Sequence, residues 1–114
     1  MITVYHNPKC SKSREGLTIV QNSGRDFFVR EYLKTPLNED ELKKLIEKLG
    51  VNAIDLIRSN EEIWKKEFKG KDLSSKDILK AMVANPKLIE RPIVENAEKA
   101  VIGRPTSNIE EMLA

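Results

Sequence analysis

The sequence contains very few of the residues that build disulfides and metal sites. Its 114 residues include a single cysteine, Cys10, and a single histidine, His6. One cysteine cannot form a disulfide within the chain, and a structural zinc site normally takes four cysteine or histidine ligands. We therefore expect no bound metal or cofactor. Any redox chemistry at Cys10 requires a second thiol from another molecule.

Long apolar runs and clusters of basic charge are also missing. No apolar stretch approaches the roughly 20 residues that cross a bilayer, and 33% of the residues are charged. The N-terminal sequence lacks the basic and apolar regions of a signal peptide, so we expect a cytoplasmic location and no membrane association. Lysine and glutamate are scattered and the net charge is +2, which argues against a nucleic-acid partner.

The two ends of the chain carry the patterns of an α/β sheet. The expected elements are a strand at 2–5, a helix at 10–22, a strand at 26–32, strands at 92–94 and 100–102, and a final helix with Ser107 as its N-cap. The first three form a βαβ unit with parallel strands, and the last three form a ββα unit with an antiparallel hairpin. This order predicts a thioredoxin-like, four-stranded mixed sheet within a single domain, 1–114.

The middle of the chain is expected to be helical. The expected elements are a helix from Asn38 to Gly50 with a capping box, a short helical stretch around 54–57, a helix at 61–68, and a helix from Ser74 or Ser75 to Asn85. Residues 36–86 are too few for a substantial core of their own. We therefore interpret them as a helical insertion within the single domain.

Cys10 is the main candidate for chemistry because it follows a Pro-Lys turn at the start of a helix. Backbone N–H groups and the helix dipole favour a thiolate there, and the thiolate is the nucleophilic form. His6 adds positive charge if it is protonated. The alternative roles are a small buried core residue for Cys10 and a turn residue bonded to nearby backbone for His6.

Two familiar thiol motifs are excluded by the residues that follow Cys10. A thioredoxin Cys-x-x-Cys motif requires cysteine at position 13, which is Ser13, and a phosphatase loop requires arginine at position 16, which is Gly16. The hydroxyl groups of Ser11 and Ser13 are candidates for stabilising a Cys10 thiolate. Helix capping is the alternative role for either serine.

Three arginines lie outside obviously solvated helix faces. Arg58 follows the apolar pair Leu56-Ile57, whereas Arg91 and Arg104 each precede a proline, which holds the arginine backbone extended. A guanidinium group can bind a tetrahedral oxyanion through two hydrogen bonds. These arginines are therefore candidate oxyanion ligands, with a surface salt bridge as the alternative role of each.

Several segments together resemble the glutaredoxin-linked arsenate reductases over nearly the whole chain. They are residues 5–14 (YHNPKCSKSR), 30–33 (REYL), 56–58 (LIR), 89–94 (IERPIV) and 103–105 (GRP). Members of this family reduce arsenate to arsenite with glutathione and glutaredoxin, which the resemblance implies as co-substrate and partner. Two features differ: better-known members usually have small residues after the cysteine, where this chain has Ser11-Lys12, and they carry a longer C-terminal tail.

The resemblance also implies roles for individual residues. Cys10 would be the nucleophile, His6 would help to stabilise its thiolate, and Pro92 would match the cis-proline that faces the cysteine in thioredoxin-like folds. The oxyanion would be held by Arg58, Arg91 and Arg104.

Two other functions remain open. One is a redox-responsive regulator of the Spx type that binds RNA polymerase, although such regulators typically carry the Cys-x-x-Cys motif that Ser13 interrupts. The other is a thiol enzyme acting on a different oxyanion or electrophile.

Overall fold

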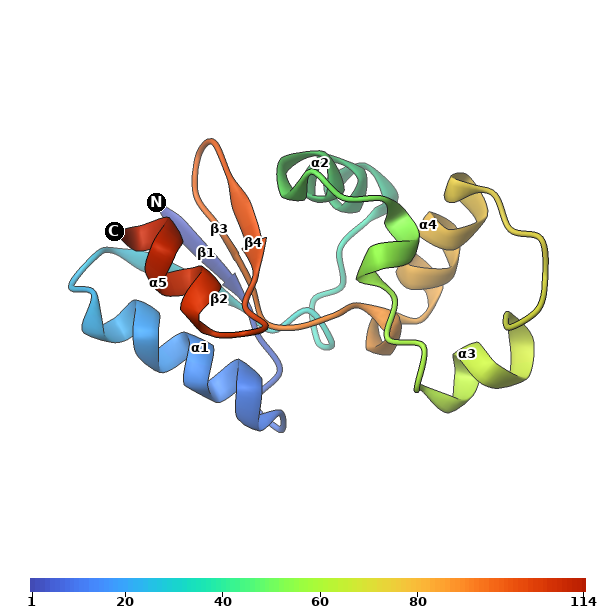
Figure 1. The fold of residues 1–114 in the computed structure, drawn as a ribbon, viewed down its shortest axis with the longest axis horizontal. Helices are drawn as coiled ribbons and strands as arrows, with labels where there is room; N and C mark the ends of the chain where they lie inside the picture. Colours follow the sequence, from blue (N-terminus) through green and yellow to red (C-terminus); the bar gives the residue numbers. More distant parts are fainter. The chain divides into compact units, whose positions relative to one another are not determined.

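The computed structural model describes residues 1–114 (Figure 1). The chain divides into two compact units. The first, here called the sheet unit, comprises Met1–Thr35 and Arg91–Ala114; the second, the helical unit, comprises Pro36–Glu90. None of the helices combines the length and the apolar composition needed to cross a membrane.

The sheet unit is built on one four-stranded mixed sheet. Its strands are β1 (Ile2–Tyr5), β2 (Phe27–Arg30), β3 (Ile93–Glu95) and β4 (Ala100–Ile102). In space their order is β2-β1-β3-β4. Strand β1 runs parallel to β2 and antiparallel to β3, and β3 pairs antiparallel with β4. The predicted α/β fold with a βαβ unit followed by a ββα unit is therefore confirmed.

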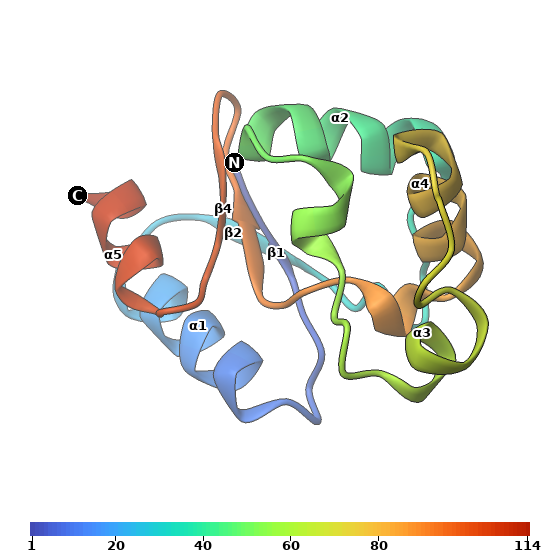
Figure 2. The same cartoon turned by 45° about the vertical axis from the view of Figure 1, so that its right-hand side comes forward.

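Two helices of the sheet unit, α1 (Ser11–Asn22) and α5 (Ser107–Leu113), pack beside each other against one face of the sheet (Figures 1 and 2). The core between them is formed by buried aliphatic side chains. They are Ile2, Val4 and Val94 from the strands, Val20 from α1 and Ile109 from α5. Residues two apart in a strand point to the same face, which is why alternate positions of β1 contribute to this core.

The first half of α1 approaches β3 and α5 very closely at a glycine. A Cβ atom added at Gly16 would lie 2.7 Å from Cγ of Pro92 and 2.9 Å from Cδ1 of Ile109. Gly103 is packed in the same way, because a Cβ atom there would lie 2.6 Å from Cδ1 of Ile109. The absence of a side chain at both glycines thus lets α1, α5 and the start of β3 come together.

Several predicted boundaries of the sheet unit are wrong: α1 begins at Ser11, not at Cys10, β2 begins at Phe27, and β3 spans Ile93–Glu95, not 92–94. Strand β2 ends at Arg30, because the chain then turns, with the amides of Lys34 and Thr35 donating to the carbonyl of Glu31. The N-cap of α5 is Thr106, and Ser107 is the first helical residue. The amide of residue 109 already donates to the Thr106 carbonyl, so the helical turn begins one residue earlier than the serine suggested.

The helical unit consists of α-helices and short 3₁₀ segments. They are α2 (Glu39–Leu49), η1 (Ala53–Leu56), α3 (Glu62–Glu67), α4 (Ser75–Ala84) and η2 (Pro86–Leu88). Helix α4 packs against α2, η1 and η2 (Figure 2). The unit begins where the predicted insertion 36–86 begins and continues to Glu90. Its place within a single domain stays a prediction.

Both longer helices of this unit start where the sequence predicts, for local reasons. Asn38 accepts a hydrogen bond from the Glu41 amide, and the Glu41 carboxylate accepts one from the Asn38 amide. Ser74 and Asp77 form the same reciprocal pair at α4. Each pair satisfies N–H groups that have no partner inside the helix. Helix α2 ends at Gly50, whose φ of 69° lies in the left-handed region that glycine adopts without strain.

Candidate active site

Cys10 immediately precedes α1 and has an extended backbone, with φ of −97° and ψ of 123°. Its side chain is half-buried and its sulfur accepts no hydrogen bond from the backbone of the first helical turn. Cys10 therefore lies at the start of the helix, as predicted, but its sulfur is not bound by the backbone N–H groups there.

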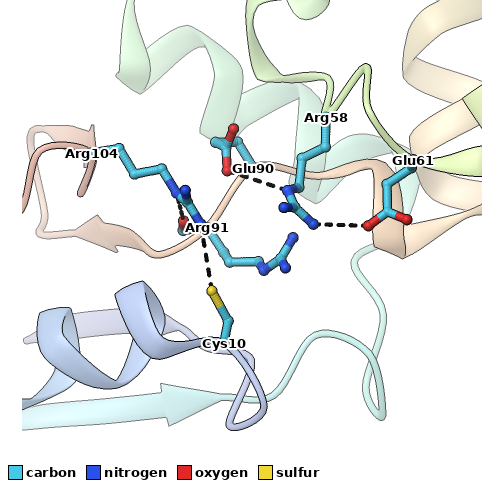
Figure 3. A network of polar contacts seen from close by, with 6 residues as sticks. All are labelled: Cys10, Arg58, Glu61, Glu90, Arg91 and Arg104. Carbon is cyan, nitrogen blue, oxygen red and sulfur yellow. Dashed lines mark hydrogen bonds and ion pairs between the residues drawn. The ribbon is translucent and has the colours of Figure 1, made fainter.

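The hydrogen-bond partner of the Cys10 sulfur is the guanidinium group of Arg104, just beyond β4. Its Nη2 atom lies 3.5 Å from Sγ of Cys10, and its Nε atom donates to the main-chain carbonyl of Arg91 at 2.7 Å (Figure 3). The carbonyl thus helps to orient the planar guanidinium group toward the sulfur. A charged donor binds a thiolate more strongly than a neutral thiol.

The loop before Cys10 is held by several short-range contacts. The amide of Cys10 donates to the Asn7 carbonyl at 3.0 Å, and the amide of Lys9 donates to Oδ1 of Asn7 at 3.1 Å. Arg14, in the first turns of α1, donates from Nη1 to the carbonyl of Pro8 at 2.9 Å. These bonds link the loop to the helix that follows it, which limits where the cysteine can lie.

His6 and Ser13 form a buried pair on either side of this loop. The exposed fraction is 6% for His6 and 0% for Ser13. Oγ of Ser13 lies 2.7 Å from Nδ1 of His6 and accepts a hydrogen bond from the amide of Asn7 at 2.9 Å. Neither side chain is hydrogen-bonded to the Cys10 sulfur; the Ser13 hydroxyl contacts His6 instead.

Burial lowers the pKa of His6 below its ordinary value of 6.5. Desolvation of the charged ring is the largest cause, and the positive charge of Arg14 adds to it. The carboxylate of Glu31 and the backbone of Ser13 act in the opposite direction without reversing the shift. The imidazole is therefore mainly neutral at pH 7, and it does not supply the positive charge that a protonated His6 would bring to this loop.

Arg91 and Pro92 immediately precede β3. The Arg91–Pro92 peptide bond is cis, as is the Arg104–Pro105 bond. Pro92 is fully buried, and Gly16 of α1 packs against its ring. Arg104 links the other two residues, because it donates to the Arg91 main-chain carbonyl and to the Cys10 sulfur.

Arg58 lies in the helical unit, where main-chain bonds fix its position. Its amide donates to the carbonyl of Leu88 at 2.7 Å, and the amide of Glu90 donates to the carbonyl of Leu56 at 2.9 Å. Its guanidinium group contacts two carboxylates: Nη1 lies 2.8 Å from Glu61, and Nε lies 3.5 Å from Glu90 (Figure 3). The salt-bridge alternative that the sequence left open for Arg58 is therefore present.

Comparison with known proteins identifies the family. The model of the ArsC family matches residues 5–112. The chain belongs to the ArsC family.

The relatives of this ArsC-family chain match it over nearly its whole length. An arsenate reductase of Haemophilus influenzae is 39% identical over 98% of each chain. An arsenate reductase of Escherichia coli is 37% identical, over 98% of this chain and 80% of that protein. The solved structure of an arsenate reductase from Vibrio cholerae has a TM-score of 0.92 and 43% identity, covering 96% of this chain and 95% of that one.

Sequence reasoning did not single out three residues that contact or hold the candidate residues, two in the helical unit and one in the sheet unit. Glu61 and Glu90 pair with Arg58, and Asn7 accepts two amide bonds within the Cys10 loop. The spacing of three residues between Arg58 and Glu61 was an available signal. From the sequence, Asn7 could be recognised only as a turn-forming residue, because its contacts depend on the path of the loop.

No group of three or more histidine, cysteine, aspartate or glutamate side chains is arranged to hold a metal ion.

Proposed function

We propose that this ArsC-family protein is an oxidoreductase that reduces arsenate to arsenite, with Cys10 as its nucleophile. The observation that carries the proposal is the Arg104 guanidinium group at 3.5 Å from the Cys10 sulfur. A sulfur nucleophile beside a fixed cation suits attack on an oxyanion, because the same cation can bind the oxygen atoms of the substrate. The arsenate reductases among the relatives support arsenate as that oxyanion.

In the first step, the Cys10 thiolate attacks the arsenic atom of arsenate. A sulfur–arsenic bond forms, and one arsenic–oxygen bond breaks. The departing oxygen takes up protons from solvent and leaves as water. Arsenic remains pentavalent in the resulting thiol–arsenate adduct. Positive charge held in place by the protein lowers the barrier, because the negative charge on the oxygen atoms shifts during attack.

In the second step, the thiolate of glutathione attacks the Cys10 sulfur. A disulfide forms between the two sulfurs, the sulfur–arsenic bond breaks, and its electron pair goes to arsenic. Arsenic is thereby reduced from the pentavalent to the trivalent state, and the two thiols are oxidised together to one disulfide. Glutaredoxin then exchanges with this mixed disulfide and returns Cys10 to its thiol form. An external thiol is needed because the chain has no second cysteine.

We propose that Arg104 and Arg91 bind the oxyanion, and that the reaction runs in the cytoplasm, where glutathione is kept reduced. Arg58 is included in this role on the basis of the sequence. Because its guanidinium group already contacts Glu61 and Glu90, an anion that it binds competes with these two carboxylates. We propose that Pro92 supports the site by packing against Gly16 of α1, the helix that follows Cys10.

Steady-state assays with arsenate, glutathione and glutaredoxin test the proposal. We expect turnover only when all three are present, and none with Cys10→Ser. Arg104→Ala should lower kcat/KM about 100-fold, the usual effect of losing one charged donor to a developing oxyanion. Arg25→Ala is the matched control, because Arg25 follows the opposite end of α1 and donates to the Leu113 carbonyl. Turnover that survives Cys10→Ser would exclude the proposed nucleophile.

A panel of oxyanions in the same assay separates arsenate from other substrates. We expect phosphate to inhibit by competition without being reduced, because it has the same tetrahedral shape and charge. Turnover of another electrophile, with none of arsenate, would retain Cys10 chemistry and assign it a different substrate.

A further inference from the structure

We propose that Ser13 is a positioning residue that donates its only hydroxyl hydrogen to Nδ1 of His6, so that the neutral imidazole carries its proton on Nε2. The proposal goes beyond thiolate stabilisation by these residues. Its link to catalysis rests on the function proposed above, whereas the hydrogen-bond arrangement can be tested without any substrate.

Ser13 is completely buried. Its exposed fraction is 0%, so water does not satisfy its hydroxyl group. Two polar partners surround Oγ: the amide of Asn7 at 2.9 Å and Nδ1 of His6 at 2.7 Å. The amide can only donate, and it occupies one of the two acceptor positions on the oxygen.

In the remaining hydrogen bond, between Oγ of Ser13 and Nδ1 of His6, either atom could be the donor. Counting the available hydrogens distinguishes these two cases. If Nδ1 carried the hydrogen and donated to Ser13, the hydroxyl hydrogen would be buried with no acceptor. If Ser13 donates to Nδ1, the buried hydroxyl hydrogen has an acceptor, and Oγ of Ser13 still accepts from the Asn7 amide. A buried donor without an acceptor is costly, so the second arrangement is favoured. It requires His6 to be the Nε2–H tautomer.

The lowered pKa of His6 agrees with this arrangement, because a neutral ring can accept at Nδ1 and a charged ring cannot. The charged groups acting on the ring are Glu31, which favours protonation, and Arg14, which opposes it. The effect of burial on the ring exceeds both.

Two consequences follow for Cys10. In this arrangement Nδ1 of His6 accepts from the Ser13 hydroxyl, so Nδ1 neither removes the thiol proton of Cys10 nor takes part in a cysteine–imidazolium ion pair. Arg104 supplies the positive charge at the sulfur instead. Ser13 also connects the chain on both sides of Cys10, because it lies in α1 and binds the amide of Asn7. Its role is to fix where the cysteine lies.

Nitrogen-15 NMR of the imidazole tests the arrangement directly, since the chain has one histidine. In the wild-type protein we expect an unprotonated Nδ1 and a protonated Nε2. A protonated Nδ1 in the neutral ring would overturn the proposal. This measurement needs no variant and no substrate.

Ser13→Ala and Ser13→Thr give a second test with a definite sign. A donor to Nδ1 stabilises the neutral ring, so its loss in Ser13→Ala should raise the titration midpoint of His6. Ser13→Thr keeps the hydroxyl and should leave the midpoint nearly unchanged. A lower midpoint in Ser13→Ala would mean that His6 donates to Ser13, contrary to the proposal.

The consequence for Cys10 is tested by its alkylation rate with iodoacetamide at pH 7. His6→Asn keeps an oxygen that can accept from Ser13, and we expect a rate within about twofold of wild type. His6→Ala and Ser13→Ala should each lower the rate about tenfold. Equal losses in His6→Asn and His6→Ala would instead indicate an imidazolium partner. A protein that passes these tests without reducing arsenate would refute the proposed function alone.

Discussion

At the scale of single residues, one side chain brings positive charge to the Cys10 sulfur and two others hold the loop that carries Cys10. Arg104 brings a guanidinium group to the sulfur, and the Arg91 carbonyl holds that group in place. His6 and Ser13, on either side of the loop, are buried and hydrogen-bonded to each other. The positive charge near the sulfur and the contacts that hold the loop therefore come from different side chains, which can be varied independently.

The lowered pKa of His6 predicts how stability depends on pH. Below pH 6.5 the unfolded chain binds a proton at His6 before the folded protein does, so acid favours unfolding. The stability that the neutral ring contributes is full above pH 6.5 and is lost as the pH falls through the lowered value. The slope is at most about 1.4 kcal/mol per pH unit.

Urea unfolding of wild type and His6→Asn between pH 7.5 and pH 5 measures this contribution, because the variant lacks the titrating ring while sharing every other group. We expect the difference in free energy of unfolding, wild type minus variant, to decrease as the pH falls below 6.5. A difference that stays constant or increases toward low pH would show that the pKa of His6 is not lowered in the folded protein.

At the scale of elements, the close packing of α1 against β3 and α5 reverses the usual effect of a glycine in a helix. Alanine in a helix interior is ordinarily favoured over glycine by about 1 kcal/mol. In Gly16→Ala the new Cβ atom would lie 2.7 Å from Cγ of Pro92, so the contact must be relieved by moving buried residues. We expect a loss of about 1–3 kcal/mol in the free energy of unfolding.

Denaturant unfolding followed by circular dichroism checks this prediction. Glu15→Ala is the control at the neighbouring exposed position, where only a surface ion pair with Lys12 is lost, and its effect should stay within about 0.5 kcal/mol. An increase in stability for Gly16→Ala would mean that helix propensity, and not packing against Pro92, governs this position.

Most element boundaries were predictable because they depend on residues close in sequence. The pair Asn38 and Glu41 determines where α2 begins, and Gly50 determines where it ends. The start of α5 was misplaced by one residue, since Ser107 has the side chain of a cap while the turn that precedes it decides the boundary. Local signals therefore suffice only where the cap residue itself makes the bond.

At the scale of the whole molecule, the family and the fold followed from motifs spread over the chain, whereas the contacts within the site did not. Sequence reasoning grouped Cys10, Arg91 and Arg104 in one candidate site, but it gave no distances between them. It also directed the Ser13 hydroxyl toward the sulfur, and the structure places that hydroxyl on His6. Contacts of this kind depend on the path of the whole loop, which no spacing rule encodes.

The central claim, that Cys10 attacks arsenate and is then released by glutathione, is tested most directly by intact-protein mass spectrometry. The protein is incubated with arsenate and glutathione in the absence of glutaredoxin, so that the mixed disulfide cannot be cleared. We predict that one glutathionyl group accumulates on Cys10 only when arsenate is present, with arsenite appearing in equal amount. Arsenite formation without this adduct, or an adduct that forms equally without arsenate, would contradict the account.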